Sequence, residues 1–457
     1  MKGITSIILA AGKGTRMKSK HPKVLHKVLG KSMIDHVIDV VDDSGIEKKV
    51  IVVGYDKEKV IAATKKRNVE IALQEETLGT AHAVMMAKDF IDNEDVLILC
   101  GDTPLLRQET IKDFIKFHRE NKLDCSVMTA NFDNSFGYGR IVRDDKNNVV
   151  KIVEEKDSNE DEKKIKEVNS GIYLLNGKLL KESFDEFKSN NSQSEYYLTD
   201  IIDIFNTKGY NVGGYSIIDN EEILGINSRI QLNMANDIMK NRILDFHMNS
   251  GVTIIDRNST IIEKGVSIGI DTIIYSGTFI SENTEIGEDC EVGPDTKIYN
   301  SKIKNLVTIK SSTIIDSIVD SGTSIGPYAY LRPNSSIGKN AKIGDFVEVK
   351  NSKIGNNSKV SHLSYIGDGQ VGHNVNIGCG VVFVNYNGKE KNKTVVKDNS
   401  FVGCNVNLVA PVVVEEGAYV AAGSTITNNV EENSLSIARA RQVNKKDWVK
   451  KSGLLKK

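Results

Sequence analysis

His362 is the residue of the second half whose chemistry is most informative. An imidazole exchanges protons near neutral pH, so it can serve as a general base. A lone histidine on a solenoid is usually a surface residue. Here the chain also offers polar residues that a scaffold does not need, namely Arg332, Lys350, Tyr365 and Asn376. Their number favours a ligand site over an ordinary solvated surface.

The first half contains a glycine-rich loop and a carboxylate, each directly after an apolar stretch. Gly12-Lys13-Gly14-Thr15-Arg16 follows residues 4–11, and Asp102 follows residues 96–100. Such a loop at the carboxyl end of a strand is suited to bind phosphates, although it fits neither the Walker nor the dinucleotide fingerprint. A carboxylate at the same sheet edge suits Mg²⁺, and equally suits a helix N-cap.

Alternating strand-like and helix-like stretches must position these first-half groups. Strands are expected at 4–11, 49–54, 96–100, 125–130 and 172–175, with helices at 34–41 and 80–90. This order predicts a doubly wound, Rossmann-like α/β sheet. Apolar residues at helical spacing then predict one linking helix over 228–249. We therefore expect a first domain over 1–227, a linker helix over 228–249 and a second domain over 250–457.

A six-residue repeat dominates the second half. The repeated aliphatic positions are Ile262, Ile268, Ile274, Ile280, Ile286, Val292 and Ile298, then Ile325, Leu331, Ile337, Ile343 and Val349, then Val402, Leu408, Val414, Val420 and Ile426. Hexapeptide repeats are typical of a parallel β-helix, in which three hexads form one triangular coil. Every sixth side chain should then point inward, with coils stacked about 4.8 Å apart.

Departures from the repeat mark the places where a site can form. The phase steps by five from Val349 to Ile354 and again from Ile366 to Val371. Between Gly380 and Val402 the phase is lost, and Asn387-Gly388 signals a turn. We expect a loop ejected from a coil, whose lysines suit a phosphate-rich ligand. Alone, it would equally well be a solvated loop.

Composition excludes several classes of protein. The 457 residues carry a formal net charge of -1, which does not suggest a nucleic-acid or membrane-surface protein. The apolar runs are too short to span a bilayer, and no signal peptide is visible. The five cysteines form no CxxC pair, which indicates a reduced, cytoplasmic protein without a disulfide framework or zinc site.

The order of motifs resembles the family of bifunctional bacterial enzymes that are both UDP-N-acetylglucosamine pyrophosphorylases and glucosamine-1-phosphate N-acetyltransferases. The likeness rests on Leu9-Ala10-Ala11-Gly12-Lys13-Gly14-Thr15-Arg16-Met17, Pro22-Lys23-Val24-Leu25, Gln74 with Gly79-Thr80, Gly101-Asp102, Gly137-Tyr138-Gly139-Arg140, Ile152-Val153-Glu154, Asn169-Ser170-Gly171-Ile172, Glu195-Tyr196-Tyr197-Leu198-Thr199-Asp200, Gly225-Ile226-Asn227 and the hexads. It implies acetylation of glucosamine 1-phosphate by acetyl-CoA to N-acetylglucosamine 1-phosphate. UMP transfer from UTP would then give UDP-N-acetylglucosamine and pyrophosphate for cell-wall precursor synthesis. It also implies that the β-helix is left-handed and forms a homotrimer, with the acetyltransferase site between subunits.

The resemblance assigns roles residue by residue. The positions implied to bind UTP and the UDP-sugar are Leu9, Ala10, Ala11, Gly12, Arg16, Lys23, Gln74, Gly79, Thr80, Gly139, Glu154, Asn169 and Asn227. Asp102 and Asn227 would hold Mg²⁺. Arg332, Lys350, Tyr365 and Asn376 would bind glucosamine 1-phosphate, with His362 as the base and Glu348 as a possible orienting carboxylate. The positions implied to contact acetyl-CoA are Cys379, Asn385, Tyr386, Lys391, Cys404, Ala422 and Arg439.

Three cysteines depart from the family pattern. Cys100 stands where the family usually has an aromatic or hydroxyl residue, Cys379 where it commonly has Ala, and Cys404 where it commonly has Ser. A thiol is a poorer hydrogen-bond donor than a hydroxyl. The tail lysines Lys445, Lys446, Lys450, Lys451, Lys456 and Lys457 suit either a solvated tail or CoA phosphates.

Three other functions compete with this interpretation. One is a monofunctional NDP-sugar pyrophosphorylase whose β-helix only assembles the oligomer. Another is an ADP- or dTDP-glucose pyrophosphorylase in the first half, which the Gly225-Ile226-Asn227 and Asn169-Ser170-Gly171 matches disfavour. The third is a non-enzymatic adhesion β-helix, which the absent signal peptide disfavours. The His362 group and the ejected loop favour the bifunctional enzyme, because a scaffold has no use for them.

Overall fold

The computed structural model describes residues 3–92 and 94–454, which lie in two compact units. The first unit extends to Met239, and the second begins at Lys240. Lys456 and Lys457 of the basic tail lie outside the described residues. Within the described ranges, none of the helices combines the length and apolar character that a membrane span requires.

A twisted, mostly parallel sheet forms the centre of the first unit. Its strands are β1 (Ile4–Ala10), β4 (Lys48–Val53), β5 (Glu70–Leu73), β6 (Asp95–Cys100), β7 (Cys125–Asn131), β10 (Glu167–Asn176) and β11 (Val212–Ser216), with β8 (Arg140–Arg143) and β9 (Val149–Val153) attached through β10. The order is β11-β7-β10-β6-β1-β4-β5. β2 (Lys27–Val28) and β3 (Lys31–Ser32) form a separate hairpin.

Helices cover both faces of this sheet, because successive strand residues alternate between the two faces. Ile8 packs in the core with α1 (Met33–Asp43) and α4 (Gln108–Glu120), whereas Ile7 packs with α3 (Thr80–Met86) and α6 (Ile201–Thr207). The remaining helices of the unit are α2 (Lys57–Thr64), α5 (Gly177–Glu182), and the short 3₁₀ turns η1 (Thr15–Met17), η2 (Lys23–Leu25), η3 (Lys88–Phe90), η4 (Glu162–Lys164), η5 (Phe184–Glu186), η6 (Leu198–Asp200) and η7 (Asn220–Ile223). The doubly wound fold is confirmed.

One strand departs from a purely parallel arrangement. β10 runs antiparallel to both β6 and β7 in the middle of the sheet. The chain reaches it from the β8–β9 hairpin rather than through a crossover helix, so it enters from the opposite end. β10 thereby carries Asn169 back to the edge at which β1 and β6 end.

The helix α7 (Arg229–Asn249) spans the boundary between the units. In the first unit, Ala235 packs with Val28, Leu105 and Ile226. In the second unit, Leu244 is fully buried in the first coils of the repeat region.

The hexad region is a left-handed parallel β-helix with three faces. The first face stacks β12 (Thr253–Ile254), β15 (Ile273–Ile274), β18 (Glu291–Val292), β21 (Thr308–Ile309), β24 (Ser324–Ile325), β27 (Lys342–Asp345), β30 (Lys359–His362), β33 (Asn376–Ile377), β36 (Phe401–Val402), β39 (Tyr419–Val420) and β41 (Leu435–Ser436). The second face stacks β13 (Ile261–Ile262), β16 (Phe279–Ile280), β19 (Lys297–Tyr299), β22 (Thr313–Ile315), β25 (Tyr330–Leu331), β28 (Glu348–Lys350), β31 (Tyr365–Gly367), β34 (Val382–Val384), β37 (Asn407–Val409) and β40 (Thr425–Ile426). The third face stacks β14 (Ser267–Ile268), β17 (Glu285–Ile286), β20 (Lys302–Ile303), β23 (Ser317–Val319), β26 (Ser335–Ile337), β29 (Lys353–Ile354), β32 (Gly369–Val371), β35 (Thr394–Val396) and β38 (Val412–Val414).

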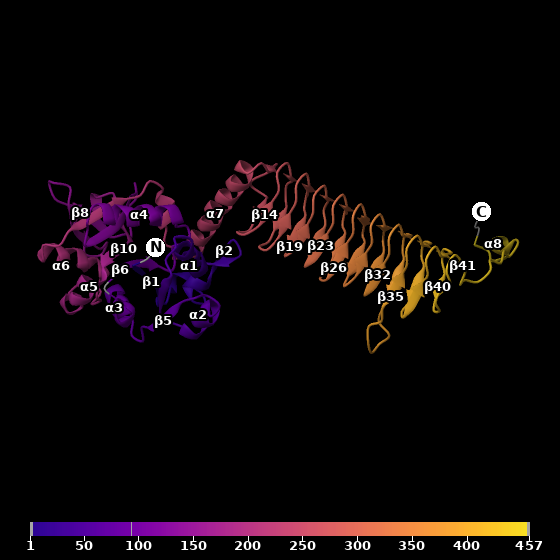
Figure 1. Cartoon of the computed structure of the whole chain (residues 1–457), viewed down its shortest axis with the longest axis horizontal. Helices are drawn as coiled ribbons and strands as arrows, with labels where there is room; N and C mark the ends of the chain where they lie inside the picture. The colour runs from indigo at the N-terminus through magenta and orange to yellow at the C-terminus, as the bar shows by residue number, and fades with distance from the viewer. Residues whose placement is uncertain (1–2, 93, 455–457) are drawn as a thin grey trace. The chain divides into compact units, whose positions relative to one another are not determined.

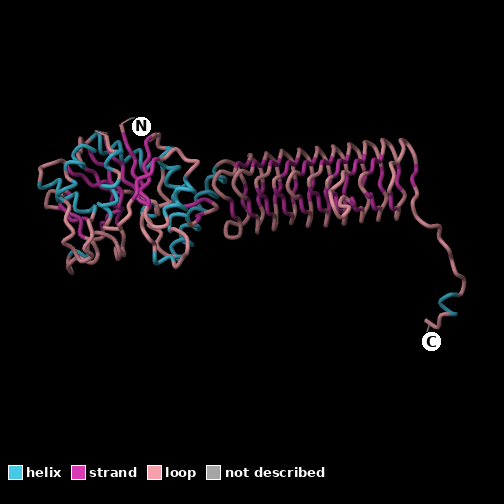
Figure 2. Tube along the Cα trace, turned by 90° about the horizontal axis from the view of Figure 1, so that it is seen from below, coloured by secondary structure: helices cyan, strands magenta, loops and turns pink. Residues whose placement is uncertain are grey.

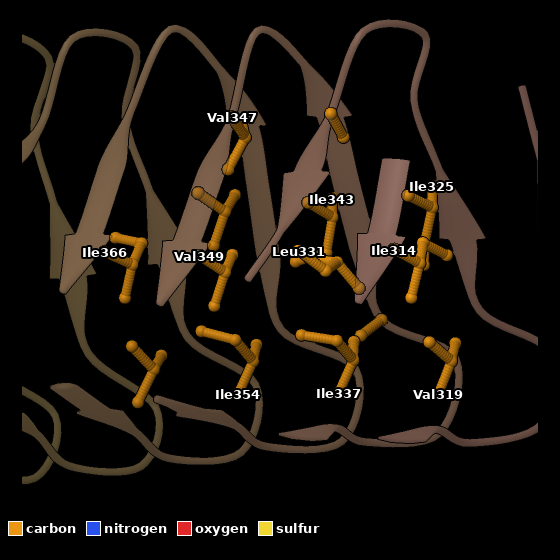
Figure 3. Close-up of a cluster of buried hydrophobic side chains, with 14 of the residues drawn as sticks. Ile314, Val319, Ile325, Leu331, Ile337, Ile343, Val347, Val349, Ile354 and Ile366 are labelled. Atoms are coloured by element: carbon orange, nitrogen blue, oxygen red, sulfur yellow. The ribbon is translucent and has the colours of Figure 1, made fainter. Parts of the chain in front are cut away.

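The aliphatic residues of the hexads fill the interior of the coils, as predicted. Leu331 and Val349 are fully buried, and Figure 3 shows them in successive coils with Ile366 beyond. Among the predicted inward positions, Ile268 is only partly buried, near the beginning of the β-helix. The strands of successive coils follow one another along the second unit (Figure 2).

The corners of the coils adopt left-handed backbone conformations. Most corner residues are Asn, Asp or Gly, which tolerate a positive φ. The corner between the first and second faces differs, because Tyr328, Phe346 and Leu363 have φ values of 59°, 55° and 47°. Their side chains are 62%, 57% and 58% exposed. We call these three residues the apolar corner.

A loop leaves the coil between β34 and β35, as predicted, and is visible near β35 in Figure 1. Tyr386 pairs with Lys391 across it, and Asn387-Gly388 forms its turn, with φ 94° at Gly388. After the last coil, the exposed tail contains α8 (Trp448–Lys451).

Candidate active sites

A cavity of about 360 Å³ opens in the first unit at the carboxyl ends of β1 and β6. The sequence-predicted residues that line it are Leu9, Ala10, Ala11, Gly12, Lys23, Gln74, Gly79, Thr80 and Asp102. Parallel strands present their following loops at one edge, which explains why residues from separate motifs meet here.

Lys23, Asp102 and Asn227 meet at one point beside this cavity. The Lys23 ammonium pairs with a carboxylate oxygen of Asp102 and donates a hydrogen bond to Asn227 Oδ1 at 2.9 Å. The Asn227 backbone is fixed by a 2.8 Å hydrogen bond to Gln231 Oε1 at the start of α7. The two side-chain oxygens predicted to bind a metal therefore converge on a single cation.

Gln74, Gly79 and Thr80 form another wall of the cavity. Gln74 Nε2 donates to the Gly79 carbonyl at 3.1 Å, and Thr80 Oγ1 accepts from the Leu198 amide at 3.0 Å. Gly79 has φ 115°, and a Cβ atom there would lie 2.4 Å from the Tyr196 carbonyl oxygen. Only glycine fits this close approach.

A second cavity of about 230 Å³ adjoins the first and shares Leu9, Thr80 and Cys100 with it. Gly139, Glu154 and Asn169 line it together with residues that the sequence analysis did not assign, namely Tyr138, Ser170, Tyr173 and Thr199. The Asn169 amide donates to the Gly139 carbonyl at 2.8 Å. Burial, reinforced by Asp157 and Asp200, raises the pKa of Glu154.

Cys100 and Arg16 occupy very different environments. Burial and the nearby Asp102 carboxylate raise the pKa of the Cys100 thiol to about 12, so it stays protonated at neutral pH. Its sulfur lies 3.7 Å from the Gly171 carbonyl oxygen. Arg16 lies on η1, is exposed, and does not line the cavity.

In the second unit, His362 and three acetyl-CoA candidates stack in one column. β30 places His362 beside Asp345 of β27, and the imidazole Nδ1 lies 2.5 Å from Asp345 Oδ1. The backbone carbonyls of His362, Cys379 and Cys404 each accept a hydrogen bond from the next coil, so the stack continues along the β-helix. The histidine column therefore consists of Asp345, His362, Cys379, Cys404 and Ala422. Arg439 is exposed. Its side chain lies beside Gly423, with Cδ 3.6 Å from the position that a Cβ atom would take on that glycine.

The other phosphate-site candidates gather on the second face. Arg332 pairs with Glu348 at 2.8 Å, and Asn385 Nδ2 lies 3.5 Å from the Tyr365 hydroxyl. Asn385 also donates to Asp368 at 2.5 Å. Proximity to the Lys350 ammonium lowers the pKa of Lys391, which indicates a local excess of positive charge. We call Arg332, Lys350, Tyr365, Asn385 and Lys391 the basic cluster.

Two features of this region differ from expectation. Glu348 binds Arg332, whereas the carboxylate on His362 is Asp345, 17 residues earlier. A spacing equal to one shortened coil is the sequence signal that identifies Asp345. Asn376 and His362 lie on the first face, and in the described part of the chain no hydrogen bond or ion pair joins them to the basic cluster.

The comparisons with known proteins cover both units. The family model described as nucleotidyl transferase matches residues 5–220, and the one described as the GMPPB C-terminal domain matches residues 315–436. The chain is 56% identical to the bifunctional protein GlmU of Clostridioides difficile, over 98% of this chain and 97% of that protein. It is 55% identical to GlmU of Alkaliphilus oremlandii, over 99% and 100%, and 51% identical to GlmU of Acetivibrio thermocellus, over 100% and 99%.

These matches run through both units, which favours a bifunctional enzyme over a nucleotidyltransferase with an inert β-helix. The chain therefore belongs to the bifunctional GlmU family and is both a glucosamine-1-phosphate N-acetyltransferase and an N-acetylglucosamine-1-phosphate uridylyltransferase.

Proposed function

We propose that uridylyl transfer takes place in the two adjoining cavities of the first unit. The larger cavity, with Gln74, Gly79 and Thr80, would hold UTP, and the smaller one, with Glu154 and Asn169, would hold N-acetylglucosamine 1-phosphate. The sugar phosphate oxygen attacks the α-phosphorus, the bond to the leaving pyrophosphate breaks, and UDP-N-acetylglucosamine forms. Such a transfer depends on positioning and charge neutralisation more than on a protein base.

The proposed metal of this site is Mg²⁺, held by Asp102 and Asn227. The convergence of both side chains on the Lys23 ammonium supports this assignment, because two oxygens are already arranged around one cation. Mg²⁺ typically uses one or two protein oxygens together with substrate phosphates. Bound there, it would neutralise phosphate charge during the transfer. Lys23 and the exposed Arg16 would supply positive charge to the triphosphate.

Acetyl transfer is proposed to take place at the histidine column. His362 is half exposed on the coil surface, so its ring can reach a substrate without disturbing the hydrophobic interior. It would accept the proton that the glucosamine nitrogen loses while attacking the acetyl-CoA thioester. Cys379, Cys404 and Ala422 of the column would contact acetyl-CoA, with Tyr386 on the ejected loop and Arg439 beyond the last coil. Arg332, Lys350 and Tyr365 of the basic cluster would bind the sugar phosphate, with Asn376.

The proposed assembly is a homotrimer. The apolar corner supports it, because three bulky residues keep an unfavourable positive φ and remain exposed. Copies of the chain packed around a threefold axis would cover such an edge. The assembly would also bring the basic cluster of one copy toward the histidine column of another, since one chain carries them on different faces.

Each activity is assigned to its own part of the chain. We assign uridylyl transfer to 1–227, the linker to 228–249 and acetyl transfer to 250–457. The enzyme would work in the cytoplasm, which suits its five unpaired cysteines.

One pair of variants tests these assignments. Asp102→Ala should abolish metal-dependent formation of UDP-N-acetylglucosamine and leave acetyl transfer unchanged. His362→Ala should lower the acetylation turnover about 10²–10⁴-fold and leave uridylyl transfer unchanged. Both half-reactions are measured on each purified variant, together with its oligomeric state. Equal loss of both activities in a folded variant, or acetylation by His362→Ala within a few-fold of the parent, would contradict the assignment.

A further inference from the structure

The shortened coil brings a carboxylate onto the imidazole of His362. β27 and β30 pair in register, with Asp345 opposite His362, and the two residues are 17 positions apart. The distance between Asp345 Oδ1 and His362 Nδ1 is 2.5 Å, which is short for a charge-assisted hydrogen bond. The hydrogen bond from His362 holds the pKa of Asp345 below its ordinary value.

The backbone fixes both residues against each other. The Leu363 amide donates to the Asp345 carbonyl at 3.0 Å, and the Ser364 hydroxyl donates to the His362 carbonyl at 2.8 Å. The Gly380 amide bonds the same His362 carbonyl at 3.3 Å. The backbone that carries the ring is therefore held from the coils on both sides, and it is paired directly with the backbone that carries the carboxylate.

The other charged groups nearby have different partners or lie elsewhere on the strands. Glu348, the carboxylate that the resemblance suggests for this role, binds Arg332 at 2.8 Å, and Asp368 accepts hydrogen bonds from Asn351 and Asn385. Lys342 lies on β27 with Asp345, and Lys359 lies on β30 with His362. Cys379 follows in the next coil of the column. Within the described chain, Asp345 is the carboxylate that contacts this imidazole.

We propose that Asp345 is a positioning residue for acetyl transfer, which keeps a proton on His362 Nδ1 and leaves Nε2 free to act as the base. This inference rests on the proposed role of His362. In the step, the amine nitrogen bonds to the thioester carbon, the carbon–sulfur bond breaks, and the nitrogen proton passes to Nε2. The leaving CoA sulfur takes that proton from the imidazolium Nε2 to become the thiol, which returns His362 to its neutral form. Asp345 keeps its negative charge throughout and faces the imidazolium that forms.

The alternative is a surface pair that contributes only to the fold. Exposed pairs between acids and bases often contribute little to stability. A structural role would change folding or substrate affinity, whereas a positioning role changes turnover and the position of the imidazole proton. These readouts separate the two explanations.

The test compares Asp345→Asn and Asp345→Glu in the full-length protein, with Asp316→Asn as the matched control. Asp316 accepts a 2.6 Å hydrogen bond from Asn300 at another corner of the β-helix, so the control makes the same change outside the column. We expect Asp345→Asn to lower kcat for acetylation about 10-fold, with KM for acetyl-CoA within about twofold. Asp345→Glu should restore part of the turnover, and Asp316→Asn should have no effect.

The imidazole proton is measured directly on protein carrying ¹⁵N-histidine, with the His362 signals assigned from their loss in His362→Gln. The parent should carry its neutral-ring proton on Nδ1, and Asp345→Asn should shift the signals toward protonation on Nε2. An unchanged tautomer, or unchanged kcat in Asp345→Asn, would overturn the proposal. If His362→Ala retained acetylation, the base itself would fail, and the role of Asp345 would fall with it. If acetylation turnover fell in His362→Ala but not in Asp345→Asn, only the positioning role of Asp345 would be refuted.

Discussion

Lys23 donates a 2.9 Å hydrogen bond to Asn227 Oδ1, although the two residues are 204 positions apart in the sequence. The same ammonium pairs with Asp102. A side-chain cation thus satisfies the two oxygens that we propose for Mg²⁺. Entry of a divalent cation must compete with Lys23, and the released ammonium would then be available to a phosphate.

This competition predicts the behaviour of Lys23→Met. Methionine keeps much of the apolar stem but removes the ammonium, so repulsion against an incoming cation disappears. We expect Mn²⁺, used as a spectroscopic probe for Mg²⁺, to bind about 10-fold more tightly in the absence of nucleotide. Uridylyl transfer should nevertheless fall, because the phosphates lose a positive partner. Electron paramagnetic resonance titration measures the affinity.

Lys13→Met is the matched control for Lys23. Lys13 lines the same cavity, but its ammonium lies over the Tyr55 ring, 5.8 Å from the ring centroid. Its removal should leave the Mn²⁺ affinity nearly unchanged. Weaker or unaltered Mn²⁺ binding by Lys23→Met would contradict the competition between ammonium and metal.

Much of the β-helix could be predicted from the sequence because its cause is local and repeated. Each hexad places one aliphatic side chain inward, so the repeat alone predicts the interior positions of Leu331, Val349 and Val420, which are fully buried. The turn at Gly388 was equally local, since Asn-Gly forms tight turns wherever it occurs. Ile268, in the first coil, is only partly buried, although the same pattern predicts it inward.

The non-local parts of the sites could not be predicted in this way. The direction of β10 depends on the path of the chain after the β8–β9 hairpin, which no single segment encodes. Glu348 and Asp345 are both carboxylates near His362 in sequence, and the register between coils places Asp345 opposite His362 but Glu348 opposite Tyr365. Spacing of 17 rather than 18 residues made Asp345 the partner.

Cys404→Ser tests whether the Cys404 thiol, in the histidine column, is a poor substitute for a hydroxyl. Cys404 is exposed in the column, two coils beyond His362. If its side chain faces the thioester carbonyl, serine should maintain or raise acetyl transfer by a few-fold, because a hydroxyl is the stronger donor. Steady-state acetylation kinetics measure this, with Cys290→Ser, buried in the β-helix interior, as a comparison. A large loss of turnover in folded Cys404→Ser would show that the thiol itself is used.

Phe346→Asn tests the proposed trimer. Phe346 stacks on Tyr328 with ring centroids 5.3 Å apart, and both have positive φ. Asparagine suits the left-handed backbone but removes the apolar surface, so the coil should stay folded while the trimer weakens. Analytical ultracentrifugation should show smaller species, and acetylation should fall with them. Uridylyl transfer should persist.

Phe136→Asn provides the control for this variant. Phe136 is 76% exposed and belongs to the first unit rather than to the apolar corner, so its replacement should leave the oligomeric state unchanged. A fully active monomer of the parent protein, or a Phe346→Asn variant that remains as tightly associated as the parent, would exclude the apolar corner as the interface.

Replacing Asp200, at the edge of the sugar-phosphate cavity, should give a gain in stability that depends on pH. Burial, followed by the Asp203 and Asp157 carboxylates, raises the pKa of Asp200 from 3.8 to about 6. Between these values the folded protein holds a proton that the unfolded chain releases, so the stability present at low pH is lost as pH rises through 6. Asp200→Asn removes this penalty. Above pH 6 it should raise the free energy of unfolding by about 1–2 kcal/mol, after allowing for partial exposure. The melting temperature of the first unit should therefore rise by a few degrees at pH 8 and hardly at all at pH 4. Asp185→Asn, at an exposed position of the same unit, should change it at neither pH. An equal gain for Asp200→Asn at both pH values would mean that the substitution acts through packing rather than through the charge.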